Sequence, residues 1–304
     1  MKKYLYLLGA AFVVGACASP KKNNMNVPEP FDFEAHRGGR GLMPENTIGA
    51  MLNAISMEKV VTLEMDVHIT KDGLVVVSHD PYFNSLITTT PEGKYLTVQE
   101  AQKTILYQMN YADIKKYDVG MKPHPDFPRQ QKTAAHKPLL TDLIDAAEAA
   151  AKTKGRTIQY NIEIKSKKAT DNINHPEPEA FVEKLVTVLK QKNILARAVI
   201  QSFDPRPLQV LHKDYPAIQT SFLVDKNGGD NVQEQINKLG FTPAIYSPIF
   251  SIVTQQVVDA CHQNKMKIVP WTANTKEEIQ KMVDMGVDGI ISDYPDLFTQ
   301  IKTK

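Results

Sequence analysis

Apolar and polar side chains alternate with a period of two along the segment Thr62-Leu63-Glu64-Met65-Asp66-Val67-His68-Ile69. This period is typical of a β-strand, whose successive side chains point to opposite faces of the sheet. Leu63, Met65 and Val67 then pack on one face, while Glu64 and Asp66 project together from the other. Carboxylates on an inward face are costly, so the pair needs either a salt bridge for each acid or a bound cation.

Similar short runs recur along the chain and alternate with helical patterns, which predicts βαβ units and a parallel sheet. We expect eight strands, and eight strands with intervening helices predict a closed (β/α)8 TIM barrel. The expected strands are residues 31–36, 62–69, 158–164, 198–203, 219–224, 244–247, 267–272 and 289–293. The expected helices include residues 47–57, 139–151, 177–191, 205–212, 230–239, 254–263 and 276–285.

One gap in this pattern predicts an insertion. Neighbouring strands follow each other at roughly 25 to 35 residues, as βα units do, except between the second and the third. We place the insertion at about 81–136, and it contains a proline-rich run at 122–128. Because βα loops open on the catalytic face of a barrel, we expect the insertion to lie over the active site and to shape the choice of substrate.

The charge balance argues against a nucleic-acid partner. The chain of 304 residues has 36 basic and 34 acidic residues, a formal net charge of +2, and no dense basic run. Its composition, 42% hydrophobic and 23% charged, is that of an ordinary globular protein. Nothing in the sequence indicates an oligomeric state.

The first residues predict export. Met1-Lys2-Lys3 is basic, and the apolar stretch that follows, residues 4–14, is too short to span a bilayer. Val14-Gly15-Ala16-Cys17 resembles a lipobox, so we expect residues 1–17 to be a lipoprotein signal peptide with a lipid on Cys17. An ordinary cleavage site nearby is the alternative. Ala18-Ser19 favours the outer membrane, which gives an exported bacterial lipoprotein facing the periplasm and held to the membrane by its lipid.

Two further expectations follow from this reading. The polar residues 18–30 form a flexible tether, and residues 31–304 form a single catalytic domain. If Cys17 is acylated, Cys261 has no intramolecular partner, and we read it as a small buried hydrophobic residue rather than a catalytic thiol.

A third carboxylate joins the first two. On the expected strand at 158–164 and just beyond it, Asn161, Glu163 and Lys165 share one face. Oxygen donors without a cluster of cysteine or histidine suit a hard cation, so Glu64, Asp66 and Glu163 predict a site for one divalent ion, Mg²⁺ or Ca²⁺.

Histidines and cations stand at the ends of the same strands. His36 ends the first strand, and His79 ends a short apolar run just after the second. Two histidines beside a carboxylate-bound metal form a candidate acid/base pair, although a single histidine is more often structural. Arg37 offers a fork-shaped cation for a phosphate, and Lys165 offers a second positive charge. Together these residues predict phosphoryl chemistry.

Several blocks of sequence, in order, resemble the motifs of the glycerophosphodiester phosphodiesterase family. The similarity spans nearly all of the chain from Phe31 onward, and the ordered set is far more specific than any one block. The blocks are His36-Arg37-Gly38-Gly39 with Pro44-Glu45-Asn46-Thr47, Glu64-Met65-Asp66-Val67 with Thr70-Lys71-Asp72-Gly73 and His79-Asp80, Asn161-Ile162-Glu163-Ile164-Lys165, Gln201-Ser202-Phe203-Asp204, Trp271-Thr272-Ala273-Asn274, and Gly286-Val287-Asp288-Gly289-Ile290-Ile291-Ser292-Asp293-Tyr294-Pro295.

The resemblance implies a function. It implies Ca²⁺ or Mg²⁺ on Glu64, Asp66 and Glu163, with His36 and His79 as acid and base. It also implies that a deacylated phospholipid is split into glycerol 3-phosphate and an alcohol, with attack by the glycerol's own hydroxyl through a cyclic intermediate. Which histidine takes the proton first, and which alcohol is preferred, stay open.

Other residues have weaker signals. Trp271 could wall a glycerol pocket, although packing alone would explain it. His68 is read as a rim contact, Gln201 as a residue that holds the site together, and the remaining histidines, His175 among them, as surface or structural. The stretch Glu45-Asn46-Thr47 is read only as the start of a helix, with Asn46 or Thr47 as its cap.

Two alternatives to the leading function remain. One is a phospholipase of similar barrel type that acts on intact lipid, like sphingomyelinase D. The other is a binding lipoprotein that has lost catalysis, although every side chain that the chemistry needs is present. The insertion reads as polar, which favours a small soluble substrate, since enzymes of lipid interfaces expose apolar loops.

Overall fold

The computed structural model describes Met1 and residues 31–303. Cys17 and the expected tether lie outside the described residues, as does the expected signal peptide apart from Met1. Within the described residues, none of the helices has the length and apolar character needed to cross a membrane.

Eight parallel strands form the barrel that the sequence predicts. Their order is β8-β7-β6-β5-β4-β2-β1-β9, and each pairs in parallel with its neighbour. Backbone hydrogen bonds join the ends of this sheet, among them those from Asp288 N to Ile268 O at 2.9 Å and from Ile291 N to Pro270 O at 2.9 Å. The strands are β1 (Asp32–Ala35), β2 (Thr62–Ile69), β4 (Gln159–Ile164), β5 (Ala198–Ser202), β6 (Gln219–Val224), β7 (Ile245–Pro248), β8 (Lys267–Ile268) and β9 (Gly289–Ser292).

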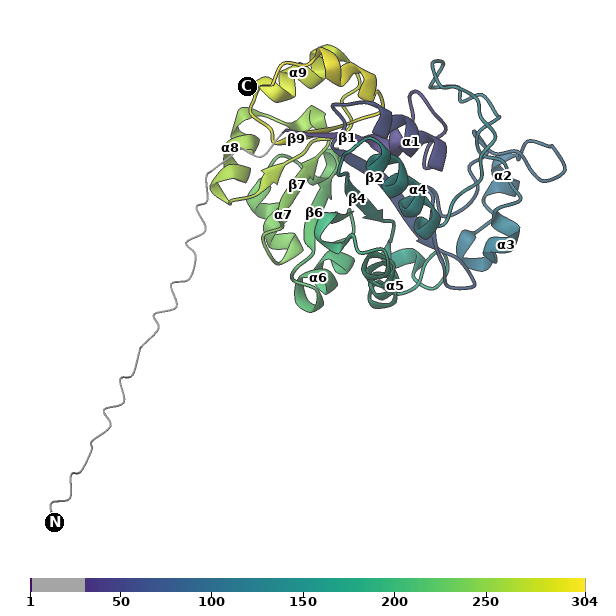
Figure 1. Ribbon diagram of the computed structural model, residues 1–304, viewed down its shortest axis with the longest axis horizontal. Coiled ribbons are helices and arrows are strands. Elements are labelled where there is room, and N and C mark those ends of the chain that lie inside the picture. Colours follow the sequence, from purple (N-terminus) through teal and green to yellow (C-terminus); the bar gives the residue numbers. More distant parts are fainter. Residues whose placement is uncertain (2–30, 304) are drawn as a thin grey trace. The chain divides into compact units, whose positions relative to one another are not determined.

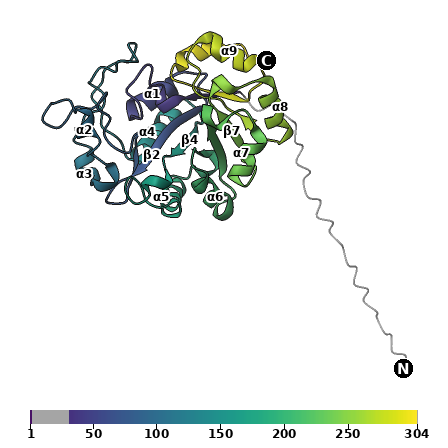
Figure 2. The ribbon, with the colours of Figure 1, turned by 180° about the vertical axis from the view of Figure 1, so that it is seen from behind.

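Helices surround these strands, as Figure 1 and the view from behind in Figure 2 show. Several begin with a threonine or asparagine cap, for example Thr47, whose hydroxyl accepts a hydrogen bond from Ala50 N. The helices are α1 (Ile48–Ser56), α4 (Leu140–Thr153), α5 (Pro178–Gln191), α6 (Pro205–Asp214), α7 (Val232–Leu239), α8 (Gln255–Gln263) and α9 (Lys276–Asp284).

The core lies between strands and helices. Leu63, Met65 and Val67 of β2 are fully buried in one apolar cluster with residues of α1 and α4, as the alternation along β2 predicts. Cys261 in α8 belongs to the same cluster, and burial raises the pKa of its thiol to about 12. The interpretation of Cys261 as a small buried hydrophobic residue is therefore confirmed.

A truncation in this core has a predictable cost. Leu63→Ala would leave a cavity between β2 and its helices, and we expect it to lower the free energy of unfolding by about 2 to 5 kcal/mol. Urea denaturation of the variant and the wild type measures the difference. A decrease in the free energy of unfolding of less than about 1 kcal/mol would mean that the core around Leu63 is packed less tightly than in this structure.

Two strands differ from the sequence prediction. An additional strand, β3 (Val75–Val77), pairs antiparallel with the end of β2, so residues 62–77 form a hairpin that the expected set of eight strands omits. The predicted strand at 267–272 is shorter, because β8 ends at Ile268. Pro270 lacks an amide hydrogen and interrupts the ladder there.

The insertion between β3 and α4 has a small core of its own. Val76 of β3 packs there with buried apolar residues of the insertion, among them Phe83, Leu106, Ile114 and Val119. It contains the short helices α2 (Val98–Ala101) and α3 (Tyr111–Ile114), which project beside the barrel in Figure 1.

The proline-rich run of the insertion reaches the loop after β1. Gln131 N donates to Leu42 O at 2.8 Å, Gln130 Nε2 donates to Arg40 O at 2.7 Å, and the ring of Phe127 lies under the guanidinium of Arg40. Arg40 Nε also lies 2.7 Å from Asp293 Oδ1, the carboxylate that contacts His36 in the site described below, so the insertion lies at the rim of that site.

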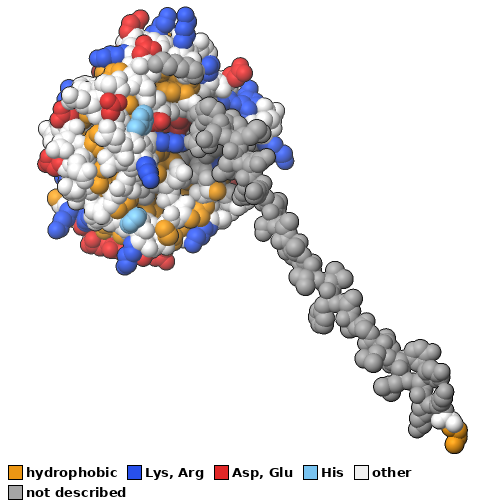
Figure 3. All heavy atoms as spheres, turned by 90° about the vertical axis from the view of Figure 1, so that its left-hand side faces the viewer, with side chains coloured by type: hydrophobic (Ala, Val, Ile, Leu, Met, Phe, Trp, Pro, Cys, Tyr) orange, Lys and Arg blue, Asp and Glu red, His pale blue; other side chains and the backbone are white. Residues whose placement is uncertain are grey.

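The surface of the insertion carries some apolar side chains among its polar ones. Leu86, Tyr95, Val98 and Met121 each expose more than two fifths of their surface. Most other exposed residues of the insertion are polar or charged, so these four are exceptions to the expectation of a polar insertion. Figure 3 shows the side of the barrel that carries α8, away from the insertion, and there basic and acidic side chains are interspersed among apolar ones.

Candidate active site

Three buried carboxylates meet at the carboxyl ends of two neighbouring strands. Glu64 and Asp66 project from β2, Glu163 projects from β4, and the register pairs Asp66 with Glu163. One oxygen of each acid lies within 4.8 Å of the others, and each residue is at most 5% exposed. The structure thus brings together the three acids that the sequence selects.

The three carboxylates are buried and repel one another. Burial and repulsion from Asp66 raise the pKa of Glu64 well above its usual range, and burial also raises the pKa of Glu163 to about 7. Burial acts in the same direction on Asp66, but Lys165 and Arg37 outweigh it and hold the pKa of that carboxyl low. The negative charge of the cluster is therefore only partly balanced by the protein itself.

A divalent cation fits this donor set. Ca²⁺ binds oxygen ligands at about 2.3 to 2.6 Å, so two oxygens on the same ion can stand up to about 5 Å apart. The separations in the cluster satisfy that limit, and a bound dication would relieve the repulsion that raises the pKa of Glu64 and Glu163. Carboxylates without thiol or imidazole donors suit Mg²⁺ or Ca²⁺.

Two basic residues flank the acids. Lys165 Nζ lies 3.2 Å from Asp66 Oδ1 and 2.9 Å from Glu163 Oε2. Arg37 is 8% exposed, and its guanidinium lies 3.0 Å from Glu45 and 3.3 Å from Asp66. The side chains of Lys165 and Arg37 therefore lie beside the acids. A phosphate bound to a metal ion on these acids would contact both of them.

The turn after β1 places Arg37. Its φ is 50°, and Gly38 and Gly39 follow with φ of 80° and 87°. A Cβ on Gly38 would lie 2.8 Å from the Cβ of Ala50, so this turn requires glycine. The conformation directs the amide of Arg37 to Glu64, to which it donates at 2.7 Å.

His36 is held by a carboxylate from the other end of the chain. Its Nδ1 lies 2.5 Å from Asp293 Oδ1, and its Nε2 lies 4.0 Å from Glu64. Because a carboxylate accepts, Nδ1 carries the proton and Nε2 presents a lone pair toward the acids. Burial lowers the pKa of His36 to about 4, although Asp293 opposes it, so the ring is neutral near pH 7.

Asp293 offers a test of this geometry. Asp293→Asn would replace a carboxylate, which only accepts, by an amide that can also donate to Nδ1, so the proton would no longer be fixed there, and we expect kcat to fall by about 10² to 10⁴ with a smaller change in KM. Steady-state kinetics on a glycerophosphodiester measures both. Unchanged kcat would show that the ring needs no such orientation.

His79, in the loop after β3, also has its own carboxylate partner. Its Nδ1 lies 3.0 Å from Asp80 Oδ1, and about a third of its side chain is exposed. Burial would raise the pKa of Asp80, but the hydrogen bond and charge of His79 lower it to about 2. Asp80 is thus placed to stabilise a protonated His79.

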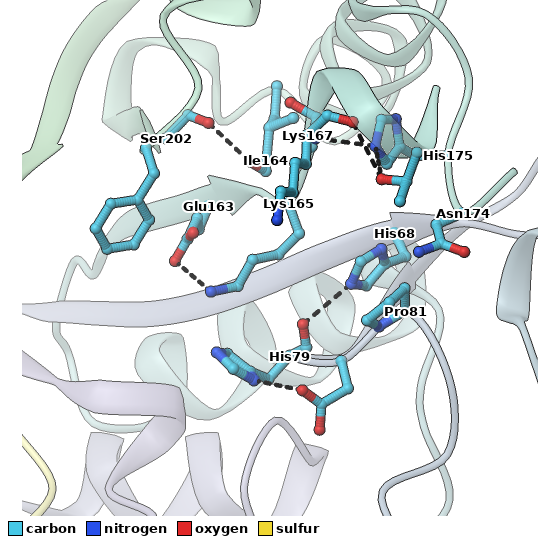
Figure 4. A pocket seen from close by; sticks show the side chains of 14 residues that line it. His68, His79, Pro81, Glu163, Ile164, Lys165, Lys167, Asn174, His175 and Ser202 are labelled. Atoms are coloured by element: carbon cyan, nitrogen blue, oxygen red, sulfur yellow. Dashed lines mark hydrogen bonds and ion pairs between the residues drawn. The ribbon is translucent and has the colours of Figure 1, made fainter. Parts of the chain in front are cut away.

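A cleft of about 610 Å³ opens beside His79 and Glu163. Figure 4 shows its walls, which come from the end of β2, the residues after β4 and the end of β5. His68, expected at the rim, is 1% exposed in the wall of this cleft. Phe203 lines the cleft as well, and Trp271 packs edge-on against it with ring centroids 5.4 Å apart. Trp271 thus packs behind Phe203 and holds that aromatic ring in the cleft wall.

Some residues that shape the site escaped the sequence analysis. Asn46 donates to Asp66 at 2.8 Å, and Glu45 pairs with Arg37, so reading this stretch only as a helix start was wrong. Thr47 is the cap, and Asn46 turns inward with φ of 57°. Gln201 was expected to hold the site together, and its contact agrees with this, since its Nε2 donates to Glu64 Oε1 at 2.8 Å.

Comparison with known proteins gives one consistent result. The Glycerophosphoryl diester phosphodiesterase family matches residues 36–297. A glycerophosphodiester phosphodiesterase from Caldanaerobacter subterraneus subsp. tengcongensis is 30% identical, over 89% of this chain and 97% of that protein. A glycerophosphodiester phosphodiesterase is, by the reaction in its name, a phosphoric diester hydrolase.

Solved structures agree with the sequence comparison. A protein from Silicibacter pomeroyi, named as a glycerophosphoryl diester phosphodiesterase, is 29% identical, with a TM-score of 0.79 over 89% of this chain and 93% of that one. A phosphodiesterase from Oleispira antarctica, solved in complex with the product sn-glycerol-3-phosphate, has the same fold, with 22% identity and a TM-score of 0.68 over 88% and 95% of the two chains. The chain described here is an enzyme, a phosphoric diester hydrolase, and belongs to the glycerophosphoryl diester phosphodiesterase family.

Proposed function

We propose that this enzyme is a metal-dependent phosphodiesterase that hydrolyses deacylated phospholipids to glycerol 3-phosphate and an alcohol. The observation that carries the proposal is the convergence of three buried carboxylates beside two imidazoles, each oriented by its own acid: His36 Nε2 lies 4.0 Å from Glu64, and His79 lines the same cleft as Glu163. The product in the Oleispira antarctica neighbour is the product that this proposal expects.

The two histidines take different tasks in this proposal. His36 is neutral and presents the lone pair of Nε2 toward the acids, so it accepts the proton of the attacking hydroxyl. His79, paired with Asp80, donates a proton to the alcohol oxygen as its bond to phosphorus breaks. When the attacking hydroxyl is the neighbouring one of the glycerol, this exchange releases the alcohol and leaves a cyclic phosphate. Water then opens the ring in a second exchange, giving a proton to His79 while His36 returns its proton to the departing glycerol oxygen, and glycerol 3-phosphate is released.

The charged residues hold the phosphate. Ca²⁺ or Mg²⁺ on Glu64, Asp66 and Glu163 would polarise the phosphoryl oxygens and offset the charge that develops on them. Lys165 and Arg37 add positive charge at the same place, and their contacts with the acids fix them before substrate arrives. This fixed arrangement lowers the cost of reorganisation during the reaction.

The direct test uses protein that lacks residues 1–17. Glycerophosphocholine and glycerophosphoethanolamine are incubated with it in Ca²⁺, in Mg²⁺ and in excess chelator, and released glycerol 3-phosphate is assayed. We expect release with at least one cation and its loss with chelator. No release from either ester with any cation would refute the proposal.

One observation favours a second candidate substrate. Leu86, Tyr95, Val98 and Met121 expose apolar surface on the insertion, which is typical of enzymes that work at a lipid interface. A phospholipase acting on a lipid that keeps an acyl chain would hydrolyse lysophosphatidylethanolamine faster than glycerophosphoethanolamine. Side-by-side rates on these two esters decide between the candidates.

We also propose that the enzyme is an exported lipoprotein of the bacterial outer membrane that faces the periplasm. The lipobox-like Val14-Gly15-Ala16-Cys17 supports this proposal. Labelling of cells with radioactive palmitate should mark the wild type and not Cys17→Ala. Equal labelling of both would overturn the proposal.

A further inference from the structure

His68 is buried in the cleft wall, and the proposed reaction gives it no task. It continues the inward face of β2 two residues beyond Asp66. Figure 4 shows its ring in the cleft wall, near His79, Pro81 and Asn174. Its position therefore connects the acidic cluster with the open part of the cleft.

One ring nitrogen of His68 has a defined partner. Nε2 lies 3.1 Å from the backbone oxygen of His79. A carbonyl oxygen only accepts hydrogen bonds, so Nε2 carries the proton. Nothing in the described residues accepts a hydrogen bond from the other nitrogen, Nδ1, so we place the ring's single proton on Nε2, and Nδ1 then presents a lone pair.

This acceptor lacks a partner in the protein. Nδ1 of His68 is buried and makes no hydrogen bond within the described residues. Buried polar atoms are almost always paired, and an exception in the wall of a ligand cleft is best explained by a group of the ligand. A hydrogen-bond donor of the substrate would supply the missing partner.

The second buried histidine of the cleft, His175, makes a useful contrast. Its Nε2 accepts from Lys167 N at 2.9 Å and lies 3.1 Å from Thr170 Oγ1, while its Nδ1 donates to Pro176 O at 2.9 Å. Both nitrogens of His175 are therefore used inside the protein, where they hold the loop after β4. Of the two rings, only His68 keeps an atom for a ligand.

The position of the cleft indicates which half of the substrate meets His68. His79 lines the cleft, whereas His36 is absent from its lining residues. In the proposed reaction His79 protonates the leaving alcohol, so that alcohol lies on the cleft side of the phosphate. His68, whose ring is bonded to the backbone of His79, faces the same space.

We propose that Nδ1 of His68 accepts a hydrogen bond from the leaving alcohol, which makes the enzyme select glycerophosphodiesters whose alcohol carries an N–H or O–H donor. The ethanolamine ester has such donors in its ammonium group. The choline ester has none, because three methyl groups replace them. This inference rests on the proposed function.

Methylation of the amine tests the inference on the wild-type enzyme. The series is glycerophosphoethanolamine, its N-methyl and N,N-dimethyl forms, and glycerophosphocholine. The first three keep an N–H at neutral pH, so kcat/KM should change little among them and fall about tenfold at the last methyl, the value of one hydrogen bond to a charged group. A steady decline with each methyl, or no decline, would overturn the inference.

Two variants separate the roles of the two ring nitrogens. In His68→Gln the side-chain amide can still donate to the carbonyl of His79 but places no acceptor where Nδ1 stood. In His68→Asn the amide oxygen replaces Nδ1, and the contact with His79 is lost. We expect His68→Gln to lose the tenfold preference for the ethanolamine ester and His68→Asn to retain it at a lower rate.

The outcomes distinguish this inference from the proposed function. If the wild type hydrolyses neither ester, the proposed function fails. Suppose instead that the wild type hydrolyses both esters and that His68→Gln slows the two reactions equally. The acceptor then serves the glycerol half that the two esters share, and only this inference is wrong. If His68→Gln keeps the preference, His68 only supports the backbone of His79.

Discussion

Glu163→Gln should lower kcat/KM by about 10³-fold and weaken the binding of Ca²⁺ or Mg²⁺. The change keeps the size of the side chain and removes one negative charge of the three that converge at the ends of β2 and β4. Coordination of a phosphoryl oxygen by a cation contributes several kcal/mol to catalysis, and each 1.36 kcal/mol changes the rate tenfold. Calorimetric titration with each cation and initial rates measure the two effects.

A matched control is available in the same chain. Glu148 in α4 pairs with Arg197 at 2.7 Å, away from the acidic cluster, and Glu148→Gln should change neither rate nor cation affinity by more than a factor of about two. If Glu163→Gln retained full cation affinity, the three carboxylates would not form the metal site. If it lost affinity and kept its rate, the cation would have no part in catalysis.

His36→Asn should reduce kcat by about 10² to 10⁴, the usual contribution of a positioned general base. Asparagine removes the Nε2 lone pair that faces the acids, while its amide can still donate to Asp293. Because His36 is not one of the three clustered oxygen donors, cation affinity should stay within about twofold of the wild type. Rapid-quench or steady-state kinetics, together with the same calorimetric titration, separate the two effects.

The control for His36 is another histidine with a carboxylate partner. His262 lies 3.0 Å from Asp288 and is largely exposed, so His262→Asn should leave kcat unchanged. Wild-type turnover in His36→Asn would assign the base to another residue. A loss of cation binding along with turnover would mean that His36 acts by holding Glu64.

The sequence was sufficient for the barrel and for the acidic cluster. Alternation along β2 predicts which residues face inward, and parallel pairing of β2 with β4 brings Glu163 to Asp66 whatever the loops do. The eight barrel strands follow from the same kind of pattern. The hairpin strand β3 was missed, because three valines in a row have no period that marks their partner or direction.

Long-range partners were harder to predict. His36 and Asp293 are separated by 257 positions, and only the closure of the barrel shows that they meet. The inward turn of Asn46 depends on its positive φ, which a helix-start pattern does not reveal. The exposed apolar side chains of the insertion depend on how its small core is filled, and local composition does not determine that.

The pairing of β1 with β9 has a consequence for the timing of activity. His36 is translated 257 positions before its carboxylate partner, and the two strands that precede these residues are neighbours only in the finished barrel. A nascent or truncated chain can hold its acids and still lack an oriented base. Turnover thus reports that translation has passed β9 and that β9 has paired with β1.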